Sequence, residues 1–263
     1  MKETAIVTSP IASVFDARGI RADEVFHGGI VEVLQKNRDT CRIRTSYGYE
    51  GFVCESHLSI AKGLHIYEKT ANSLHRVAHS FADVLDGPDV KARIAATLPR
   101  GAEILAGTCV DDFAPVIMAD GRDYYMMGAA LEKAQTAPVA DMRRALVKTA
   151  ESYVGAGYRW GGRSPAGIDC SGLVFMAYWL NGVIIWRDSK IMPGFAMAKI
   201  EFEEADVGDL IFFDGHVAML ANDGKIIHSC QRRGGVCVES VGSAKAHYRK
   251  GLHEGILYAG TIF

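Results

Sequence analysis

The sequence predicts an α+β protein in which two small β-barrels precede a C-terminal domain of helices packed on an antiparallel sheet. The first half reads as short strands, several of which alternate apolar and polar residues. The second half contains an apolar helix that follows a glycine-rich loop, and then a series of strands joined by tight turns.

The first barrel is expected at residues 1–62. Its strands are expected at 5–7, 25–26, 29–34, 40–45 and 50–53, with turns at 37–39 and 47–49. Short strands at this spacing are typical of a small barrel. A second barrel at residues 72–131 repeats the plan more loosely, and Pro115 then takes an edge or bulge position.

A linker at residues 132–140, which contains Pro138, precedes the C-terminal domain at residues 141–263. Asp141 is expected to cap a helix. The spacing of Leu146, Ala150 and Tyr153 gives that helix one buried face.

Cys170 lies where a glycine-rich loop gives way to an apolar helix at residues 173–180. A thiol at the start of a helix lies at the positive end of the helix dipole, which favours the thiolate. The thiolate is the nucleophilic form of cysteine. Cys170 is therefore the candidate nucleophile, in preference to a small buried hydrophobic residue.

Two histidines downstream are the candidate partners of this thiol. Strands are expected at residues 208–213, 216–221 and 225–229, so that His216 begins the second strand and His228 lies in the third. Side chains alternate between the two faces of a strand, so the loop between these strands decides whether the histidines meet.

Two loop lengths are possible at this turn. A loop of Asp223 and Gly224 alone would place the two histidines on opposite faces. A loop that also includes Asn222 pairs Ala221 with Lys225 and places both histidines on one face, as diagonal neighbours about 7–8 Å apart. A relay of nucleophile, base and orienting residue therefore predicts the three-residue loop.

The sequence from Trp160 to Val174, with the motifs Gly-Asp-Leu-Ile-Phe-Phe at 208–213, His-Val at 216–217 and Ile-Ile-His at 226–228, resembles the NlpC family of papain-like cell-wall cysteine peptidases. The resemblance covers about the last half of the chain. It implies Cys170 as nucleophile, His216 as general base and His228 as the polar residue that orients the base.

The same resemblance implies the reaction and its partner. The expected activity is hydrolysis of the γ-D-glutamyl–diamino acid bond in a peptidoglycan-derived peptide. No metal and no organic cofactor are expected to take part. The family resemblance does not choose between diaminopimelate and lysine at the third position of the peptide, and it leaves the oligomeric state open.

The end of the first barrel, residues 47–58, resembles a bacterial SH3-like domain, and both barrels are expected to be of this kind. Among the family enzymes with a similar three-domain plan are some that act on free muropeptides with an N-terminal L-Ala. They hold its ammonium group with a glutamate and a tyrosine of the barrel and with acidic and hydroxyl groups of the peptidase domain. The corresponding residues here are Glu24, Tyr49, Asp169, Ser171, Asp188 and Ser189.

Other interpretations of these residues stay open. Asp169 immediately precedes the helix and can equally be its N-cap. Asp188 can pair with the neighbouring Arg187. Tyr47 competes with Tyr49 for the place in the barrel.

The composition and the cysteine pattern limit which partners and which location are expected. The chain has 263 residues, is 49% hydrophobic and has a net charge of −2, which gives no argument for nucleic acid or an anionic membrane surface. It begins without a signal-peptide pattern, and its six cysteines lack the spacing of a secreted disulfide framework. The expected location is the cytoplasm, with a role in murein recycling, or the cell envelope if a leader has been removed.

Four other functions remain as alternatives. They are a hydrolase of intact peptidoglycan in the envelope, an amidase or acyltransferase on the same scaffold, a non-catalytic wall-binding protein, and a zinc-binding domain. The zinc alternative is disfavoured because the chain has neither a CxxC nor an HExxH motif.

Overall fold

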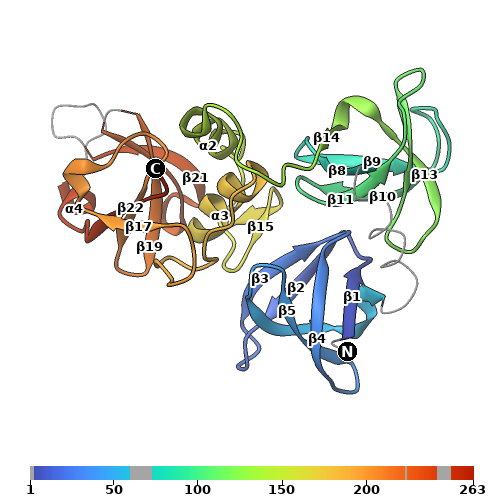
Figure 1. The fold of residues 1–263 in the computed structure, drawn as a ribbon, viewed down its shortest axis with the longest axis horizontal. Coiled ribbons are helices and arrows are strands. Elements are labelled where there is room, and N and C mark those ends of the chain that lie inside the picture. The colour runs from blue at the N-terminus through green and yellow to red at the C-terminus, as the bar shows by residue number, and fades with distance from the viewer. Residues whose placement is uncertain (1–2, 60–72, 223, 242–249) are drawn as a thin grey trace. The chain divides into compact units, whose positions relative to one another are not determined.

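The computed structural model describes residues 3–59, 73–222, 224–241 and 250–263. The chain forms two compact units, Met1–Ala134 and Gln135–Phe263, each with its own sheets (Figure 1). In these described ranges, the helices are all too short or too polar to cross a membrane.

Unit 1 begins with a seven-stranded antiparallel sheet. Its members are β1 (Glu3–Val7), β2 (Ile11–Phe15), β3 (Arg21–Phe26), β4 (Ile30–Lys36), β5 (Thr40–Thr45), β6 (Glu50–Cys54), the 3-10 helix η1 (Glu55–His57) and β7 (Leu58–Ser59). The strands are arranged in the order β3-β2-β6-β5-β4-β1-β7. Alternating apolar side chains such as Val31, Val33 and Ile43 form its core.

A second seven-stranded sheet completes unit 1. Its members are β8 (Leu74–Val77), β9 (Phe81–Leu85), β10 (Ile94–Pro99), β11 (Glu103–Ala106), β12 (Phe113–Ile117), β13 (Asp123–Met127), the 3-10 helix η3 (Gly128–Ala130) and β14 (Leu131–Lys133). The order β10-β9-β13-β12-β11-β8-β14 repeats that of the first sheet with every strand number raised by seven. The SH3-like assignment and the four domain boundaries stay predictions.

The two sheets of unit 1 contact each other through His27. Its backbone oxygen accepts a hydrogen bond from the Glu103 N–H at 2.8 Å, and its Nε2 accepts one from the Ala119 N–H at 3.0 Å. Its Nδ1 lies 2.9 Å from the Thr8 carbonyl oxygen, to which it donates. Burial lowers the pKa of His27, so the neutral ring can serve both bonds.

Unit 2 contains a six-stranded antiparallel sheet in the order β17-β22-β18-β19-β20-β21. Its strands are β17 (Ala198–Ile200), β18 (Leu210–Phe213), β19 (His216–Asn222), β20 (Lys225–Cys230), β21 (Gly235–Ser240) and β22 (Tyr258–Thr261). The remaining elements are α2 (Met142–Glu151), β15 (Arg163–Ser164), β16 (Gly167–Ile168), α3 (Cys170–Leu180), η4 (Phe202–Glu204), η5 (Gln231–Arg233) and α4 (Lys250–His253).

The predicted α+β class, with helices packed on an antiparallel sheet, is wrong. Antiparallel strands make up most of the regular structure in the described ranges, where α2 and α3 are the α-helices longer than one turn. The fold class depends on how many residues lie in helices and how many in strands. The prediction gave too much weight to one apolar helix. Short strands extend over most of the described part of unit 1, and the described ranges are therefore mostly β.

The turn between β19 and β20 also differs from the prediction. Asn222 pairs with Lys225, so the predicted pairing of Ala221 with Lys225 is wrong. Asp223, at the tip of the predicted loop, lies outside the described residues. A loop this short would separate the two histidines if the register stayed regular.

The register does not stay regular. It shifts between Leu220 and Asn222, which leaves one extra residue in β19 and forms a β-bulge. Beyond the bulge, Leu220 pairs with Ile226, and this register puts His216 and His228 on the same face. The predicted outcome therefore arises from a bulge rather than from the loop length.

Candidate active site

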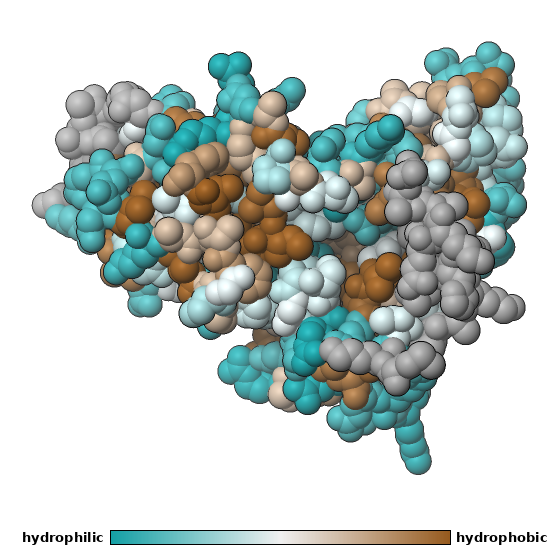
Figure 2. Space-filling view, in the orientation of Figure 1, coloured by the Kyte–Doolittle hydropathy of each residue, from teal (hydrophilic) through white to brown (hydrophobic). Residues whose placement is uncertain are grey.

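Cys170 is the first residue of α3, and its side chain is buried. Asp169 is the N-cap, and its Oδ1 accepts a hydrogen bond from the Gly172 N–H at 2.6 Å. All residues of α3 except Trp179 are buried, which holds the start of the helix in a fixed place. On the face shown in Figure 2, hydrophobic residues gather in the part of unit 2 that carries α3.

The surroundings of Cys170 favour its thiol form. Burial raises its pKa to about 11, and the negative charge of Asp169 acts in the same direction. The backbone N–H groups of Val217 and Ser171 lower the pKa, but by less than burial raises it. Burial therefore outweighs the helix dipole, and the expected thiolate is not the resting state.

His216 is the first residue of β19. The next residue, Val217, contacts the Cys170 thiol through its backbone N–H. Its Nε2 lies 2.8 Å from Nδ1 of His228, so the two rings share a hydrogen bond. Burial lowers the pKa of His216 to about 4, and His228 acts in the same direction. His216 is therefore neutral at pH 7 and can accept a proton.

The hydrogen-bond chain continues to Glu239 in β21, a residue to which the sequence analysis assigned no role. Its Oε2 lies 3.0 Å from Nε2 of His228, and both side chains are 1% exposed. Its Oε1 accepts from Arg232 at 3.0 Å and from Arg233 at 3.1 Å. The sequence shows only a glutamate in the segment that follows the strand of His228. Whether its side chain faces His228 depends on the register between β20 and β21, which the sequence does not give.

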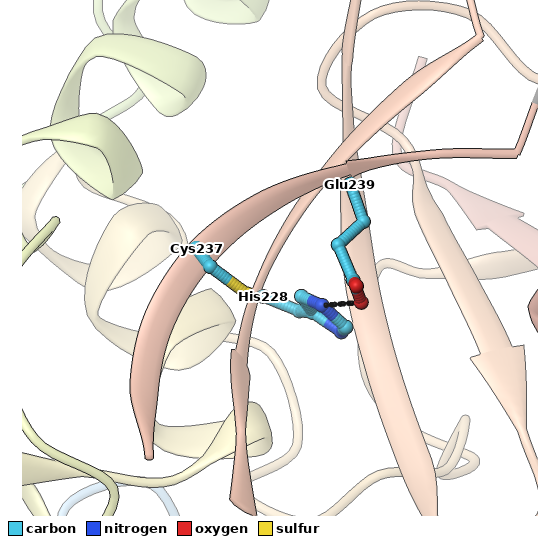
Figure 3. Close-up of side chains that lie close together, drawn as sticks. All are labelled: His228, Cys237 and Glu239. Atoms are coloured by element: carbon cyan, nitrogen blue, oxygen red, sulfur yellow. Dashed lines mark hydrogen bonds and ion pairs between the residues drawn. The ribbon is translucent and has the colours of Figure 1, made fainter. Parts of the chain in front are cut away.

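Three of these neighbouring side chains could hold a metal ion. His228, Cys237 and Glu239 offer ligand atoms that lie within 4.8 Å of one another. Cys237 pairs with His228 across the strands, and Glu239 is two residues further along β21, so all three share a face (Figure 3). An imidazole, a thiolate and a carboxylate are donors that suit zinc.

Two observations count against a metal at this cluster. The guanidinium groups of Arg232 and Arg233, which bond to Glu239, would lie next to the cation and repel it. The nitrogen of His228 that faces Glu239 is already in a hydrogen bond with that carboxylate. The donor set fits zinc in type, but its present bonding fits a hydrogen-bond chain better.

Asp169 and Ser171 belong to a second polar cluster, centred on Arg187. The guanidinium of Arg187 is fully buried, and its Nη1 lies 3.2 Å from Oδ1 of Asp169. The same Nη1 donates to Oγ of Ser171 at 2.8 Å. Oδ2 of Asp169 accepts from the Gly161 N–H at 2.7 Å, so this carboxylate joins the glycine-rich loop to the start of α3.

Asp188 and Ser189 directly follow Arg187 in the chain, and both are partly buried. Oδ2 of Asp188 accepts a hydrogen bond from the indole N–H of Trp186 at 3.2 Å. Asp188 also lines a mainly apolar pocket together with Trp186, Phe195 and Val217. Val217 lines this pocket, and its backbone N–H contacts the Cys170 thiol.

Tyr158 is a further polar neighbour of the thiol. Burial raises its pKa to about 12, and the charges of Cys170 and Asp169 act in the same direction. The phenol therefore keeps its proton at neutral pH and can donate a hydrogen bond next to the nucleophile.

Glu24 and Tyr49 lie in unit 1. Glu24 is buried in β3, 3.6 Å from Nη1 of Arg21. Tyr49 is partly exposed, whereas the competing Tyr47 is buried and donates its hydroxyl proton to Asp23. The roles of Glu24 and Tyr49 at a substrate site stay predictions.

The comparisons with known proteins agree with this geometry. The NlpC/P60 family model matches residues 155–252. Dipeptidyl-peptidase 6 of Lysinibacillus sphaericus is 33% identical over 271 residues, a match that covers 98% of this chain and 99% of the relative. The bifunctional muramidase/DL-endopeptidase CwlT of Bacillus subtilis is 36% identical over 98 residues, or 34% of this chain and 30% of that protein.

A solved structure of an NlpC/P60 family protein from Bacillus cereus superposes with a TM-score of 0.81 and 20% identity, covering 97% of this chain and 98% of that one. This similarity shows the shared fold. The chain belongs to the NlpC/P60 family. The predicted family is therefore confirmed, as is its coarse activity as a peptidase. The individual site residues stay predictions.

Proposed function

We propose that the chain is a cysteine endopeptidase that cleaves the γ-D-glutamyl–diamino acid bond of peptidoglycan stem peptides. The observation that carries this proposal is the hydrogen bond between His216 and His228 beside a buried thiol at the start of α3. This arrangement supplies a nucleophile, a neutral base and a group that orients the base.

The reaction starts from an uncharged pair. As the Cys170 sulfur attacks the γ-carbonyl carbon, its proton moves to His216 and the carbonyl oxygen becomes negative. The backbone N–H of Cys170 and the Tyr158 hydroxyl are the donors proposed for this oxyanion. His216 then gives the proton to the amine of the diamino acid as the carbon–nitrogen bond breaks, and water hydrolyses the thioester.

We further propose that the preferred substrate is a free stem peptide with an N-terminal L-Ala. The name dipeptidyl-peptidase of the long relative agrees with release of a dipeptide, here L-Ala-γ-D-Glu, from a free amino end. The name DL-endopeptidase agrees with cleavage between a D- and an L-residue. Asp188 has the charge that an ammonium group needs, although Lys190 lines the same pocket.

The internal repeat of unit 1 supports a binding role for the carboxylates of the first sheet. Asp23 and Glu24 in β3 correspond to Ala96 and Thr97 in β10. The first pair is opposite Val14 and Ser13 of β2, and the second is opposite the equivalent residues Val84 and Asp83 of β9. A sheet with this strand order therefore forms without charges at these positions. Buried carboxylates are costly, so a function other than folding is the better reason for them.

A peptidase for free peptides would act in murein recycling in the cytoplasm. A peptidase for intact wall would act in the envelope, and the two differ in the substrate that they require. We propose the first, because it is the role that a pocket for a free ammonium group would serve.

The experiment compares three substrates with one protein preparation. These are L-Ala-γ-D-Glu-diaminopimelate, its N-acetylated form and intact wall, with Cys170→Ala as the inactive variant and Cys109→Ala as a matched control at an exposed cysteine. Cleavage of the free-amine peptide alone, lost only in Cys170→Ala, would support the whole proposal. Equal cleavage of the acetylated peptide or the wall would reject the ammonium pocket and recycling, and no cleavage would reject the peptide specificity.

A further inference from the structure

The histidine pair is followed by a carboxylate, whereas the family resemblance gave His228 as the last member, the polar residue that orients the base. We infer that Glu239 is a positioning residue that, through His228, sets which nitrogen of His216 carries the proton. This inference deepens the proposed function and depends on the same site. It is carried by a continuous line of hydrogen bonds at 2.8 and 3.0 Å from His216 to Glu239.

The protonation states follow from the end of this line. Glu239 accepts hydrogen bonds from Arg232 and Arg233, and two guanidinium groups favour the ionised carboxylate. An ionised carboxylate only accepts hydrogen bonds, so Nε2 of His228 must be the donor. The other nitrogen of a neutral His228, Nδ1, is then an acceptor.

The same logic extends to His216. Since Nδ1 of His228 accepts, Nε2 of His216 must carry the proton and donate it across the 2.8 Å contact. The remaining nitrogen of His216, Nδ1, then has a free lone pair. That nitrogen is the one left for the Cys170 proton, so the state of Glu239 decides whether His216 can act as a base.

Glu239 also matters once His216 has taken the proton. The resulting imidazolium is a buried cation, and the carboxylate behind His228 favours that charge. The side chains of Arg232 and Arg233 are about half exposed, at 55% and 51%. Solvent therefore weakens their effect on the site, while the carboxylate that they hold is fully enclosed.

A zinc ion held by His228, Cys237 and Glu239 is the competing use of the same atoms. A cation there would lie next to the guanidinium groups of Arg232 and Arg233, which repel it. It would also have to break the bond between His228 and Glu239. The relay needs none of these changes, and the geometry favours it.

The first test is the histidine tautomer, read from the side-chain nitrogen resonances of ¹⁵N-labelled protein at pH 7. The relay requires both His216 and His228 to be neutral with the proton on Nε2. Assignment is made with His216→Gln and His228→Gln. A doubly protonated His228, or a proton on Nδ1 of either ring, would overturn the inference, as would stoichiometric zinc in the purified protein.

The second test follows the rate at which iodoacetamide alkylates Cys170, which requires no peptide substrate. We expect Glu239→Gln to slow alkylation at pH 7 and to lower kcat with KM unchanged, each by about tenfold, the equivalent of one pKa unit in His216. Glu239→Asp keeps the charge and should retain more of both rates. Val238→Thr, an exposed position on the same strand, is the matched control that should change neither.

The outcomes separate this inference from the proposed function. Slower alkylation in Glu239→Gln with no peptide cleavage by the unmodified protein would keep the relay and reject the substrate. Normal alkylation in a folded Glu239→Gln protein would reject the relay, whatever the protein cleaves. If Glu239→Gln does not fold, the histidine tautomers of the unmodified protein decide, and a proton on Nδ1 of either ring would reject the relay.

Discussion

Asp169 and Glu239 are both buried carboxylates with arginine partners in unit 2, but they bind different kinds of groups. Asp169 accepts from two backbone N–H groups and from the fully buried Arg187. Glu239 accepts from a histidine on one oxygen and from two half-exposed arginines on the other. The partners of Asp169 are backbone N–H groups, a hydroxyl and a guanidinium, whereas Glu239 bonds to an imidazole, whose two nitrogens can donate or accept a proton.

The difference separates two uses of the same chemical group. A carboxylate with only fixed partners holds the loop and the helix start in one geometry, which is what the Asp169 cluster does for Cys170. A carboxylate bonded to an imidazole is coupled to a proton that moves during the reaction. Burial and an arginine partner alone therefore do not tell a structural acid from a functional one, and the chemical type of the remaining partner has to be known as well.

The largest effect is expected when the fixed cluster is broken. Asp169→Ala leaves the guanidinium of Arg187 buried without its carboxylate, and removing one member of a buried ion pair costs about 3–5 kcal/mol. We expect the free energy of unfolding, measured with denaturant, to fall by about that amount. Asp141→Asn is the control, since the Asp141 side chain is 62% exposed in a surface pair and should matter little. A loss for Asp169→Ala as small as that of the control would show that Arg187 finds other partners.

The pH dependence of kcat/KM should show the two carboxylates acting on different limbs. Activity should fall as pH decreases toward about 4, because protonated His216 is no longer a base, and as pH rises toward about 11, because Cys170 loses its proton. Asp169 raises the pKa of Cys170, so Asp169→Asn should move the alkaline limb to lower pH.

Glu239 raises the pKa of His216, so Glu239→Gln should move the acid limb to lower pH. Both limbs are read from pH–rate profiles with the free peptide. An acid limb near the ordinary histidine value in the unmodified protein would contradict the buried, neutral base. Identical shifts in both variants would mean that the two carboxylates have the same role.

The smallest effect is expected at the edge of the Glu239 cluster. Arg233→Gln removes one of two solvent-screened guanidinium groups, and such exposed pairs contribute about 0–1 kcal/mol. We expect kcat to fall less than fivefold and the unfolding free energy to change by less than about 1 kcal/mol. Arg144→Gln, at an 85% exposed side chain, is the control for general surface effects. A loss in Arg233→Gln as large as that in Glu239→Gln would show that the arginine is itself essential to the relay.

Much of the second unit could be predicted from local sequence. Short-range signals mark the glycine-rich loop, the helix start at Cys170 and the strands of His216 and His228. In the structure Cys170 begins α3, and the two histidines lie in β19 and β20. The N-cap alternative for Asp169 was also visible, because an acidic residue before an apolar helix is a standard cap.

The remaining features depend on contacts between distant residues. The bulge in β19 that brings the histidines together has no turn signal of its own. The approach of Glu239 to His228 depends on the register of β20 with β21, and the pairing of Arg187 with Asp169 links residues eighteen positions apart. The class was predicted wrongly for a related reason, because a conspicuous motif in one region was weighed above the extent of strand elsewhere.

The matching strand orders of the two sheets in unit 1 have a historical consequence. The equivalence extends to local detail, since β6, η1 and β7 in the first sheet have β13, η3 and β14 as their counterparts. Such agreement is what a tandem duplication of one ancestral module would leave behind. After duplication, one copy could maintain the architecture while the other accumulated costly substitutions, and the acidic pair in β3 lies in only one of the two copies.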